Sequence, residues 1–258
     1  MLRLAGLVAA LAVFVVALGP PKQMASRLGW RFAPWAPVLF QRLLCAGLGV
    51  TVQLHGGVDD ARSQLIVANH VSWLDIPILG SLAPMSFLAK REVGNHPIGR
   101  WLVALQGAVY VDRGRRRAIP ATNAEMVKTM RTGSPVVLFA EATTGDGNRL
   151  LRFRSSHFEA IRIAAESDAS AMVQPVYLAY SRLAGLPVSR GERPRIAWYG
   201  DMTFLRHFFR FVQSGGVICD VYFGPPIRVP PDMSRKTVAR LTKAAVRRLS
   251  AQARSQQL

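Results

Sequence analysis

Short apolar runs alternate with stretches of helical periodicity from about residue 51 onward. The runs that predict strands are Leu65–Ala68, Ser86–Ala89, Ala108–Val111, Val136–Phe139, Met172–Leu178, Arg195–Trp198 and Val217–Phe223. The stretches that predict helices are Asp75–Leu82, Ile98–Leu105, Ala118–Arg131, Phe158–Glu166, Thr203–Ser214 and Ser234–Ala253. Such alternation is typical of α/β domains, so we expect one α/β domain over residues 51–258.

The last predicted helix carries apolar residues on one face and basic residues on the other. The apolar positions are Val238, Leu241, Ala245 and Leu249. This spacing predicts a surface helix that packs on the domain by its apolar face. A helix lying on a membrane surface is the alternative.

Residues 1–50 have a different pattern, which predicts membrane-associating helices. An uninterrupted apolar run extends from Leu4 to Gly19 and ends at Pro20. It is somewhat shorter than the roughly 20 residues that span a bilayer, so a spanning anchor and a helix lying in the interface both stay open. The prolines that follow the run argue against a cleaved signal peptide. Positive charges gather after the run, which places the α/β domain that follows on the cytoplasmic side of the inner membrane.

The stretch from Trp30 to Leu54 combines aromatic residues with arginines and then becomes rich in leucine. Aromatic residues beside arginines suit the headgroup region of a bilayer. An amphipathic helix of the protein core fits the same pattern.

The charge of the chain points to an anionic partner. The 258 residues contain 33 Lys and Arg against 15 Asp and Glu, a net charge of +18. Such a protein seeks nucleic acid or an anionic membrane leaflet. The sequence contains no nucleic-acid-binding motif, and the apolar start of the chain favours anionic membrane lipid over nucleic acid. The two cysteines, Cys45 and Cys219, are far apart and indicate neither a disulfide framework nor a zinc site.

A histidine and an aspartate follow the predicted strand Leu65–Ala68. His70 and Asp75 are five positions apart, and five residues of a helix turn about 500°. The two side chains can therefore meet only if the helix begins between them, with Ser72 or Asn69 as its cap. In that case the carboxylate would orient the imidazole for general-base chemistry. A loop histidine and a helical aspartate with no shared role remain the alternative.

Three later blocks also end predicted strands with polar groups. Residues 107–113 form a strand that delivers Arg113, whose guanidinium suits a phosphate. Residues 137–148 deliver Glu141 and then a turn rich in threonine and glycine, whose N–H groups suit an anion. Residues 173–176 form a strand interrupted by proline.

Together the four blocks, in this order, resemble those of the glycerolipid acyltransferases, the 1-acylglycerol-3-phosphate acyltransferase superfamily. The resemblance implies a mixed central sheet flanked by helices. It also implies that His70 and Asp75 are catalytic, and that Arg113, Glu141 and Thr143 bind substrate. No metal or redox cofactor is implied.

The third block departs from the family pattern at two positions. Ala140 stands where proline is usual, and Ala142 stands where glycine is usual. If the second position requires a positive φ, an alanine there is strained.

A finer resemblance concerns residues 145–156 and 198–202, which look like the bacterial branch that includes the lyso-ornithine lipid O-acyltransferases. The resemblance implies that an acyl group moves from acyl-ACP or acyl-CoA to a lysolipid hydroxyl. We expect 1-acyl-sn-glycerol-3-phosphate as the acceptor, with phosphatidic acid as the product and lyso-ornithine lipid as the alternative acceptor. A catalytically impaired membrane scaffold and a thioesterase are the competing functions.

This mechanism makes two demands on the surroundings of His70. The oxyanion that develops at the thioester carbonyl needs donors, which we expect among the backbone N–H groups near His70. Burying about ten CH₂ groups of the acyl chain contributes roughly 8 kcal/mol, so an apolar groove should lie beside the site.

The predicted membrane segment can be tested by deletion. Removing residues 1–21 should lower the fraction of the protein that sediments with membranes. The binding that remains should decrease with added salt, because it depends on charge. His70→Ala, which leaves the segment intact, is the control. A full-length protein that stays soluble at low salt without detergent would contradict the prediction.

Overall fold

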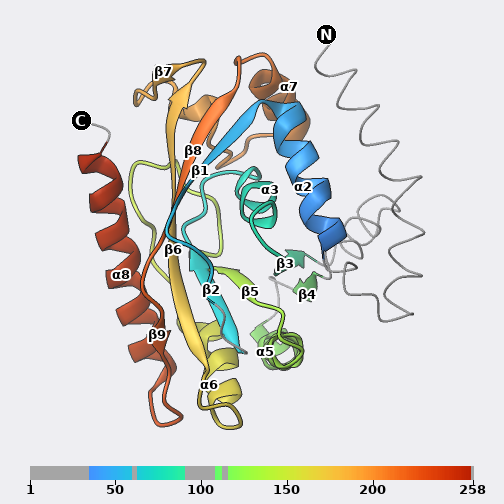
Figure 1. The fold of residues 1–258 in the computed structure, drawn as a ribbon, viewed down its shortest axis with the longest axis vertical. Helices are drawn as coiled ribbons and strands as arrows, with labels where there is room; N and C mark the ends of the chain where they lie inside the picture. Colours follow the sequence, from blue (N-terminus) through green and yellow to red (C-terminus); the bar gives the residue numbers. More distant parts are fainter. Residues whose placement is uncertain (1–34, 60–62, 91–107, 112–115, 257–258) are drawn as a thin grey trace.

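One sheet forms the middle layer of the protein. The computed structural model describes residues 35–59, 63–90, 108–111 and 116–256, and within them nine strands form the sheet. The strands are β1 (Val50–His55), β2 (Gln64–Ala68), β3 (Ser86–Lys90), β4 (Val109–Val111), β5 (Val136–Phe139), β6 (Met172–Leu183), β7 (Leu186–Pro187), β8 (Val217–Phe223) and β9 (Ile227–Arg228). Their order is β1-β8-β6-β2-β5-β3-β4, and β7 and β9 pair with β6 (Figure 1).

The sheet is mixed, as predicted. Strand β2 lies at its centre and runs parallel to both β5 and β6. Strand β8 runs antiparallel to β6 and parallel to β1. The carboxyl ends of β2 and β5 therefore meet at one edge of the sheet, and the loops that carry His70 and Glu141 leave from that edge.

Helices cover both faces of the sheet. They are α2 (Trp35–Leu48), α3 (Asp75–Gly80), α5 (Ile119–Arg131), α6 (Glu159–Ala165), α7 (Phe204–Val212) and α8 (Arg235–Ser255). Short 3₁₀ turns occur at Arg116–Ala118, Ser155–Phe158 and Arg193–Arg195. Figure 1 shows α8 on one side of the sheet and α2 and α3 on the other.

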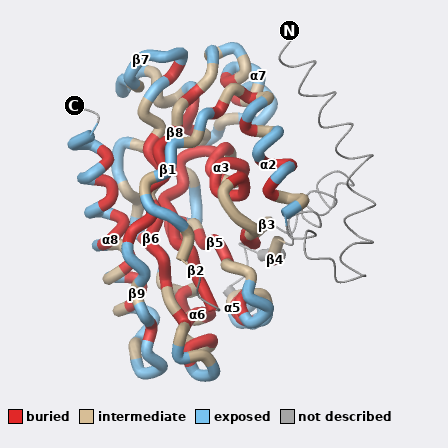
Figure 2. Tube along the Cα trace, in the orientation of Figure 1, coloured by how far each residue is buried: buried red, intermediate tan, exposed pale blue. Residues whose placement is uncertain are grey.

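Two cores result from this layering, and β2 contributes to both. Ile66 and Ala68 face the core formed with α2, α3 and α7, whereas Leu65 and Val67 face the core formed with α5, α6 and α8. All five residues of β2 are buried (Figure 2). A strand covered on both faces has to be apolar at nearly every position, which explains the continuous run in the sequence.

The C-terminal helix α8 packs on β6 by the predicted apolar face. Val238, Ala245 and Leu249 are buried there, and Leu241 is half-buried. The helix begins after Ser234, whose hydroxyl accepts a hydrogen bond from the N–H of Thr237 at 3.2 Å. This cap satisfies a donor of the first turn that would otherwise be unpaired.

One predicted strand was wrong, and one predicted stretch is divided between two elements. The predicted strand Arg195–Trp198 is a turn, because the N–H groups of Ile196 and Ala197 both donate to the carbonyl of Arg193 instead of to a neighbouring strand. The stretch from Trp30 to Leu54 contains the core helix α2, as its alternative interpretation predicted, but then continues into β1, which ends at His55. Gly49, at a φ of 72°, separates the helix from the strand.

Helix α2 belongs to the core rather than standing apart from it. Val38, Phe40 and Leu48 are buried, and α2 packs against α3. The boundary at residue 50 stays a prediction. The predicted anchor run Leu4–Gly19, the predicted helix Ile98–Leu105 and Arg113 lie outside the described residues. Among the helices that the structure describes, none has both the length and the hydropathy needed to cross a bilayer.

Candidate active site

Asn69 fixes the point where the chain leaves the sheet. Strand β2 ends at Ala68, and the buried Asn69 amide then takes the place of a backbone peptide against β6. Its Nδ2 donates to the carbonyl of Leu178 at 3.1 Å, and its Oδ1 accepts from the N–H of Leu178 at 2.8 Å. An aspartate or leucine could not supply both a donor and an acceptor. Asn69 thereby sets where His70 begins its loop.

The carboxylate of Asp75 organises that loop. Asp75 is the first residue of α3 and has no exposed surface. Its Oδ2 accepts from His70 Nδ1 at 2.8 Å and from the N–H groups of Val71 at 2.7 Å and Ser72 at 3.0 Å. Its Oδ1 accepts from the hydroxyl of Tyr180 at 2.5 Å. A buried carboxylate requires such partners.

The predicted meeting of His70 and Asp75 is confirmed in its geometry. Helix α3 begins at Asp75, and His70 lies on the incoming loop. The predicted cap was wrong, because Leu74 occupies the cap position and no side chain accepts a hydrogen bond there. Since a carboxylate accepts the bond at Nδ1, the neutral ring carries its proton on Nδ1. The Nε2 atom is then free of a proton and can accept one.

The third block holds His70 from the opposite side. The ring of His70 stacks on Phe139, with centroids 4.0 Å apart and planes at 12°. The N–H of His70 donates to Glu141 Oε2 at 3.3 Å, and its carbonyl accepts from the N–H of Gly145 at 2.8 Å. The last residue of β5 therefore fixes the ring plane of His70, and the loop that follows β5 fixes its backbone.

Glu141 is buried and bonded to the backbone. Its second oxygen, Oε1, accepts from the N–H of Leu151 at 3.0 Å, so the carboxyl group joins the loops that carry His70 and Leu151. Burial raises the pKa of Glu141 from 4.5 to about 7, and the N–H groups of Leu151 and His70 oppose that shift. The geometry favours a positioning role for Glu141, and its predicted substrate contact stays a prediction.

Ala140 and Ala142, the two departures of the third block from the family pattern, differ in their effect on the backbone. Ala140 is buried and its carbonyl accepts from the N–H of Arg154, a bond that a proline at this position could accept equally well. Ala142 adopts a φ of 60°, in the left-handed region that glycine occupies without strain. Thr143 follows in the same turn and is exposed. Its predicted substrate contact stays a prediction.

Three backbone N–H groups near His70, where the oxyanion donors are expected, are already used. Those of Val71 and Ser72 donate to Asp75, and that of His70 donates to Glu141. In this conformation they hold the loop together and do not point at a substrate carbonyl. These three groups are therefore not the oxyanion hole in this conformation, and the expectation that other backbone N–H groups near His70 supply the donors stays a prediction.

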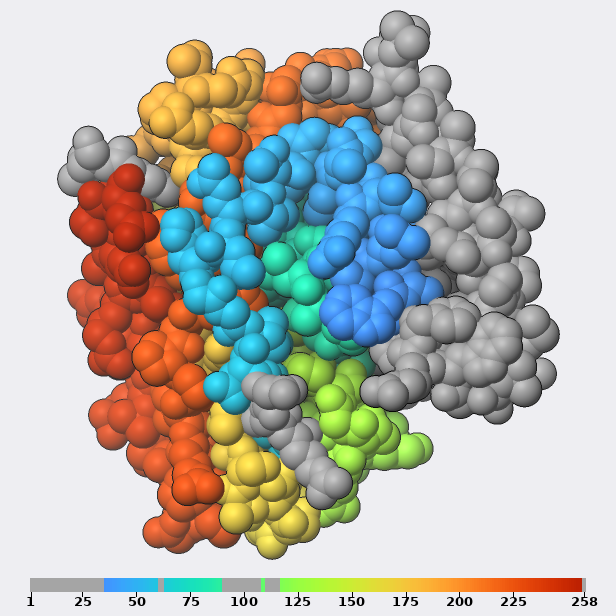
Figure 3. All heavy atoms as spheres, viewed as in Figure 1, coloured from blue at the N-terminus to red at the C-terminus, as the bar shows by residue number. Residues whose placement is uncertain are grey.

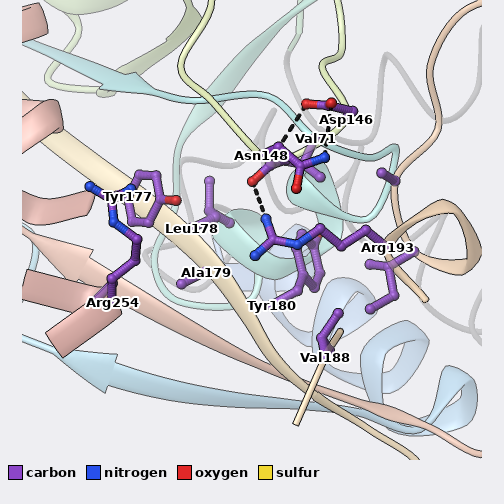
Figure 4. Close-up of a pocket in the computed structure, with 14 residues that line it drawn as sticks. Val71, Asp146, Asn148, Tyr177, Leu178, Ala179, Tyr180, Val188, Arg193 and Arg254 are labelled. Carbon is purple, nitrogen blue, oxygen red and sulfur yellow. Dashed lines mark hydrogen bonds between the residues drawn. The ribbon is translucent and has the colours of Figure 1, made fainter. Parts of the chain in front are cut away.

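A cavity of about 560 Å³, including its open mouth, lies beside the loop. Val71 and Leu178 supply apolar lining, and Asp146, Arg193 and Arg254 supply charge of both signs (Figure 4). The guanidinium of Arg193 also donates to the carbonyl of Gly147 and so holds the glycine turn of the third block. This mixed lining suits a molecule with charged and apolar parts better than an acyl chain alone.

Sequence reasoning missed Tyr180, Phe139 and a second histidine–carboxylate pair. Tyr180 is 105 positions from Asp75, so no local pattern joins them. His55 and Asp220 are 165 positions apart, and no sequence pattern joins them. The structure pairs His55 Nε2 with Asp220 Oδ1 at 2.9 Å across the parallel strands β1 and β8. Within the part of the chain that the structure describes, no group of His, Cys, Asp and Glu could hold a metal ion.

The resemblance implies that His70 and Asp75 are catalytic residues of an acyltransferase. Comparison with known families tests whether the chain belongs to such a family. The family model described as "Acyltransferase" matches residues 50–179, about half of the chain. The chain belongs to the acyltransferase family. The protein is therefore an enzyme of acyl transfer, and the matched segment includes β1, the His70 loop, the Glu141 loop and most of β6.

Individual relatives extend the match. The lyso-ornithine lipid O-acyltransferase of Brucella abortus (strain 2308) is 33% identical over 252 residues, covering 96% of this chain and 94% of that protein. The one from Rhizobium meliloti (strain 1021) is 36% identical over 217 residues, covering 83% and 74%. The 1-acyl-sn-glycerol-3-phosphate acyltransferase of Neisseria meningitidis serogroup B (strain ATCC BAA-335 / MC58) is 34% identical over 166 residues, covering 62% of each chain.

A solved structure shares the fold. The 1-acyl-sn-glycerophosphate (LPA) acyltransferase from Thermotoga maritima superposes with a TM-score of 0.65 at 19% identity, covering 97% of this chain and 95% of that one. At this identity the likeness establishes the fold.

The raised pKa of Glu141 predicts a pH dependence of stability. A group whose pKa is raised by folding contributes stability that is fully present below its unfolded pKa and is lost as pH rises through the folded value. From pH 4.5 to above 7, the wild type should therefore lose up to about 3 kcal/mol of unfolding free energy relative to Glu141→Gln, which cannot ionise. Denaturant titrations of both proteins across this range measure the difference, in which all other groups cancel. Parallel pH profiles would contradict the prediction.

The strained alanine predicts a stabilising substitution. Ala142→Gly removes the strain of an alanine in the left-handed region. A glycine loses more conformational entropy on folding, which offsets part of this gain, so we expect the unfolding free energy to rise by roughly 0.5–1 kcal/mol. Ala184→Gly is the matched control, because Ala184 is exposed at a φ of 49° in the β6–β7 turn. Both variants should unfold at higher denaturant concentration, and only Ala142→Gly should change turnover. A less stable Ala142→Gly would show that the turn does not strain the alanine.

Proposed function

We propose that the protein is a lysolipid O-acyltransferase that moves a fatty acyl group from the thioester of acyl-ACP or acyl-CoA to a lipid hydroxyl. The observation that carries the proposal is the pairing of His70 with Asp75. It leaves Nε2 as a proton acceptor in a ring whose plane is fixed by Phe139. A general base of this kind activates a hydroxyl without a covalent acyl-enzyme.

The reaction follows from the proton on Nδ1. Nε2 of His70 takes the proton of the acceptor hydroxyl as the oxygen attacks the thioester carbonyl. The resulting imidazolium donates to Asp75 through Nδ1, and the buried carboxylate stabilises this positive charge. The tetrahedral intermediate then expels the thiolate of the carrier, which receives the proton from Nε2. The products are an ester and a free thiol.

Tyr180 completes the support of Asp75. Burial raises the pKa of Tyr180 well above its ordinary value, and the charge of Asp75 adds to the shift. The phenol therefore stays protonated and donates to Oδ1 throughout the reaction. This bond keeps Oδ2 directed at the His70 loop.

Lyso-ornithine lipid is the acceptor that we favour. The relatives with this name match 83% and 96% of the chain, whereas the acyltransferase from Neisseria meningitidis matches 62%. The segments that resemble this branch also lie against the catalytic loop. The N–H of Trp198 donates to the carbonyl of Val71 at 2.9 Å, and Arg193 holds Gly147. Segments in contact with the loop are well placed to select the acceptor.

1-Acyl-sn-glycerol-3-phosphate is the second candidate. It is favoured by the 34% identity to the Neisseria meningitidis protein and by the shared fold of the Thermotoga maritima enzyme. For either acceptor we place the enzyme at the inner membrane, with its catalytic domain facing the cytoplasm. The excess of positive charge after the N-terminal apolar run supports this placement.

The proposal predicts which variants lose activity. With labelled acyl-ACP or acyl-CoA as donor, His70→Ala and Asp75→Asn should lower the rate by a factor on the order of 10²–10⁴ with either lysolipid. His55→Ala is the matched control, because it breaks a histidine–aspartate pair of similar length away from the catalytic loop. It should keep wild-type turnover.

The acceptor is decided by the ratio of kcat/KM for the two lysolipids in the wild type. A ratio that favours lyso-ornithine lipid supports the first candidate, and the opposite ratio replaces it with the second. Wild-type protein that transfers acyl groups to neither lysolipid, or only to water, would refute the proposed function. Near wild-type turnover in His70→Ala would refute the mechanism.

A further inference from the structure

Helix α7 exposes more apolar surface than a helix of its length normally leaves to water. Phe204 is 45% exposed, Leu205 is 66% exposed and Phe209 is 50% exposed, all within the nine residues of Phe204–Val212. Single exposed apolar residues are common on soluble proteins, but a cluster of large ones marks an interaction site. We call Leu205, Phe209, Arg206 and Arg210 the α7 surface.

The α7 surface is ordered as two adjacent stripes. Leu205 and Phe209 are four positions apart and share one stripe of the helix, and Arg206 and Arg210 share the next. Both arginines are exposed. The opposite side of the helix is used by the protein, because His207 and Phe211 are buried there. Packing among the described residues therefore leaves the α7 surface open to solvent.

The inner side of α7 packs directly against the catalytic loop. Trp73, two positions before Asp75, lies edge-on to Phe204 and Phe211 with centroids 5.5 Å and 5.9 Å away. Its Nε1 donates to Nδ1 of His207 at 3.1 Å. Burial lowers the pKa of His207, which keeps the ring neutral and able to accept this bond. Whatever holds the outer side of α7 therefore also positions the loop that carries His70.

The chemistry of the two stripes specifies the partner. An apolar stripe beside a basic stripe is the pattern of a helix that lies in the interface of an anionic bilayer, where the arginines meet lipid phosphates. The net charge of +18 over the whole chain adds to that attraction. A protein partner would need a groove that is both apolar and acidic, whereas the net charge of +18 spread over the whole chain suits an extended anionic surface such as a bilayer.

We infer that α7 docks the catalytic domain on the surface of an anionic membrane, with Leu205 and Phe209 inserted among the lipids and Arg206 and Arg210 at the headgroups. The helix lies at the upper end of the molecule in Figures 1 and 3. This contact is additional to the N-terminal segment and goes beyond the proposed function. It would set the His70 loop, through Trp73, against the layer in which lipid substrates reside.

A nitroxide label on α7 tests the inference without turnover. Cys45 and Cys219 are buried and their thiols have raised pKa values, so a cysteine introduced at the surface reacts selectively. We would label Phe209→Cys in the full chain, and Glu166→Cys as control. Glu166 is about half exposed at the end of α6, far from α7 in Figure 1. Both proteins are reconstituted in vesicles of equal parts phosphatidylethanolamine and phosphatidylglycerol.

The readout is collision of the label with oxygen, which concentrates in lipid, and with a nickel chelate, which stays in water. We expect the label at position 209 to gain collisions with oxygen and lose those with nickel when vesicles are present, while the label at 166 changes in neither. Adding Arg206→Glu and Arg210→Glu to the 209-labelled protein should restore collisions with nickel, because the reversed charges are repelled by phosphatidylglycerol.

Three other results would overturn the inference. A label at 209 that stays as accessible to nickel as the label at 166 would place α7 in water. Protection from nickel that Arg206→Glu and Arg210→Glu leave unchanged would show that something other than anionic lipid, such as another segment of this chain, covers α7. Spin–spin broadening at 209 would show a second copy of the chain there. None of these measurements depends on the acceptor, so the proposed function is judged separately by its own assay.

Discussion

The active-site loop depends on one buried carboxylate. Asp75 receives four hydrogen bonds, from a ring nitrogen, two backbone N–H groups and a phenol. A carboxylate removed from water is costly unless its lone pairs are filled, so the loop between His70 and α3 has to curl around it. The curl sets the first turn of α3, the tautomer of His70 and the contact with β6 through Tyr180.

A second carboxyl group holds the same loop from the other side, with a different electrostatic outcome. Glu141 accepts only two backbone hydrogen bonds and its pKa is raised to about 7, because burial outweighs those bonds. Together the two groups occupy backbone donors around His70. The N–H groups of the loop therefore hold the loop in place, and the fixed ring can present Nε2 to the acceptor.

The chemistry of the substrate connects the site with the outer surface of the protein. An acyl acceptor that is a lipid stays in a membrane, so the enzyme has to bring His70 to that layer. Trp73 belongs to the loop and packs on α7, whose other side presents apolar and basic stripes to solvent. The aromatic contact makes the loop and the proposed membrane surface one packed unit, which is how docking would bear on catalysis.

The sequence by itself determined most of the elements and the pairing of His70 with Asp75. The apolar runs are continuous because β2 and its neighbours are covered on both faces, and the five-position spacing requires a helix to begin after His70 if the two side chains are to meet. Both are local constraints on the chain. Tertiary structure decided what depends on contacts across the chain: the pairing of His55 with Asp220, the bond from Tyr180, and the use of Glu141 as a tie between loops. It also turned Arg195–Trp198 away from the sheet. These features stay hidden in a sequence because their partners lie up to 165 positions away, and only folding brings the strands together.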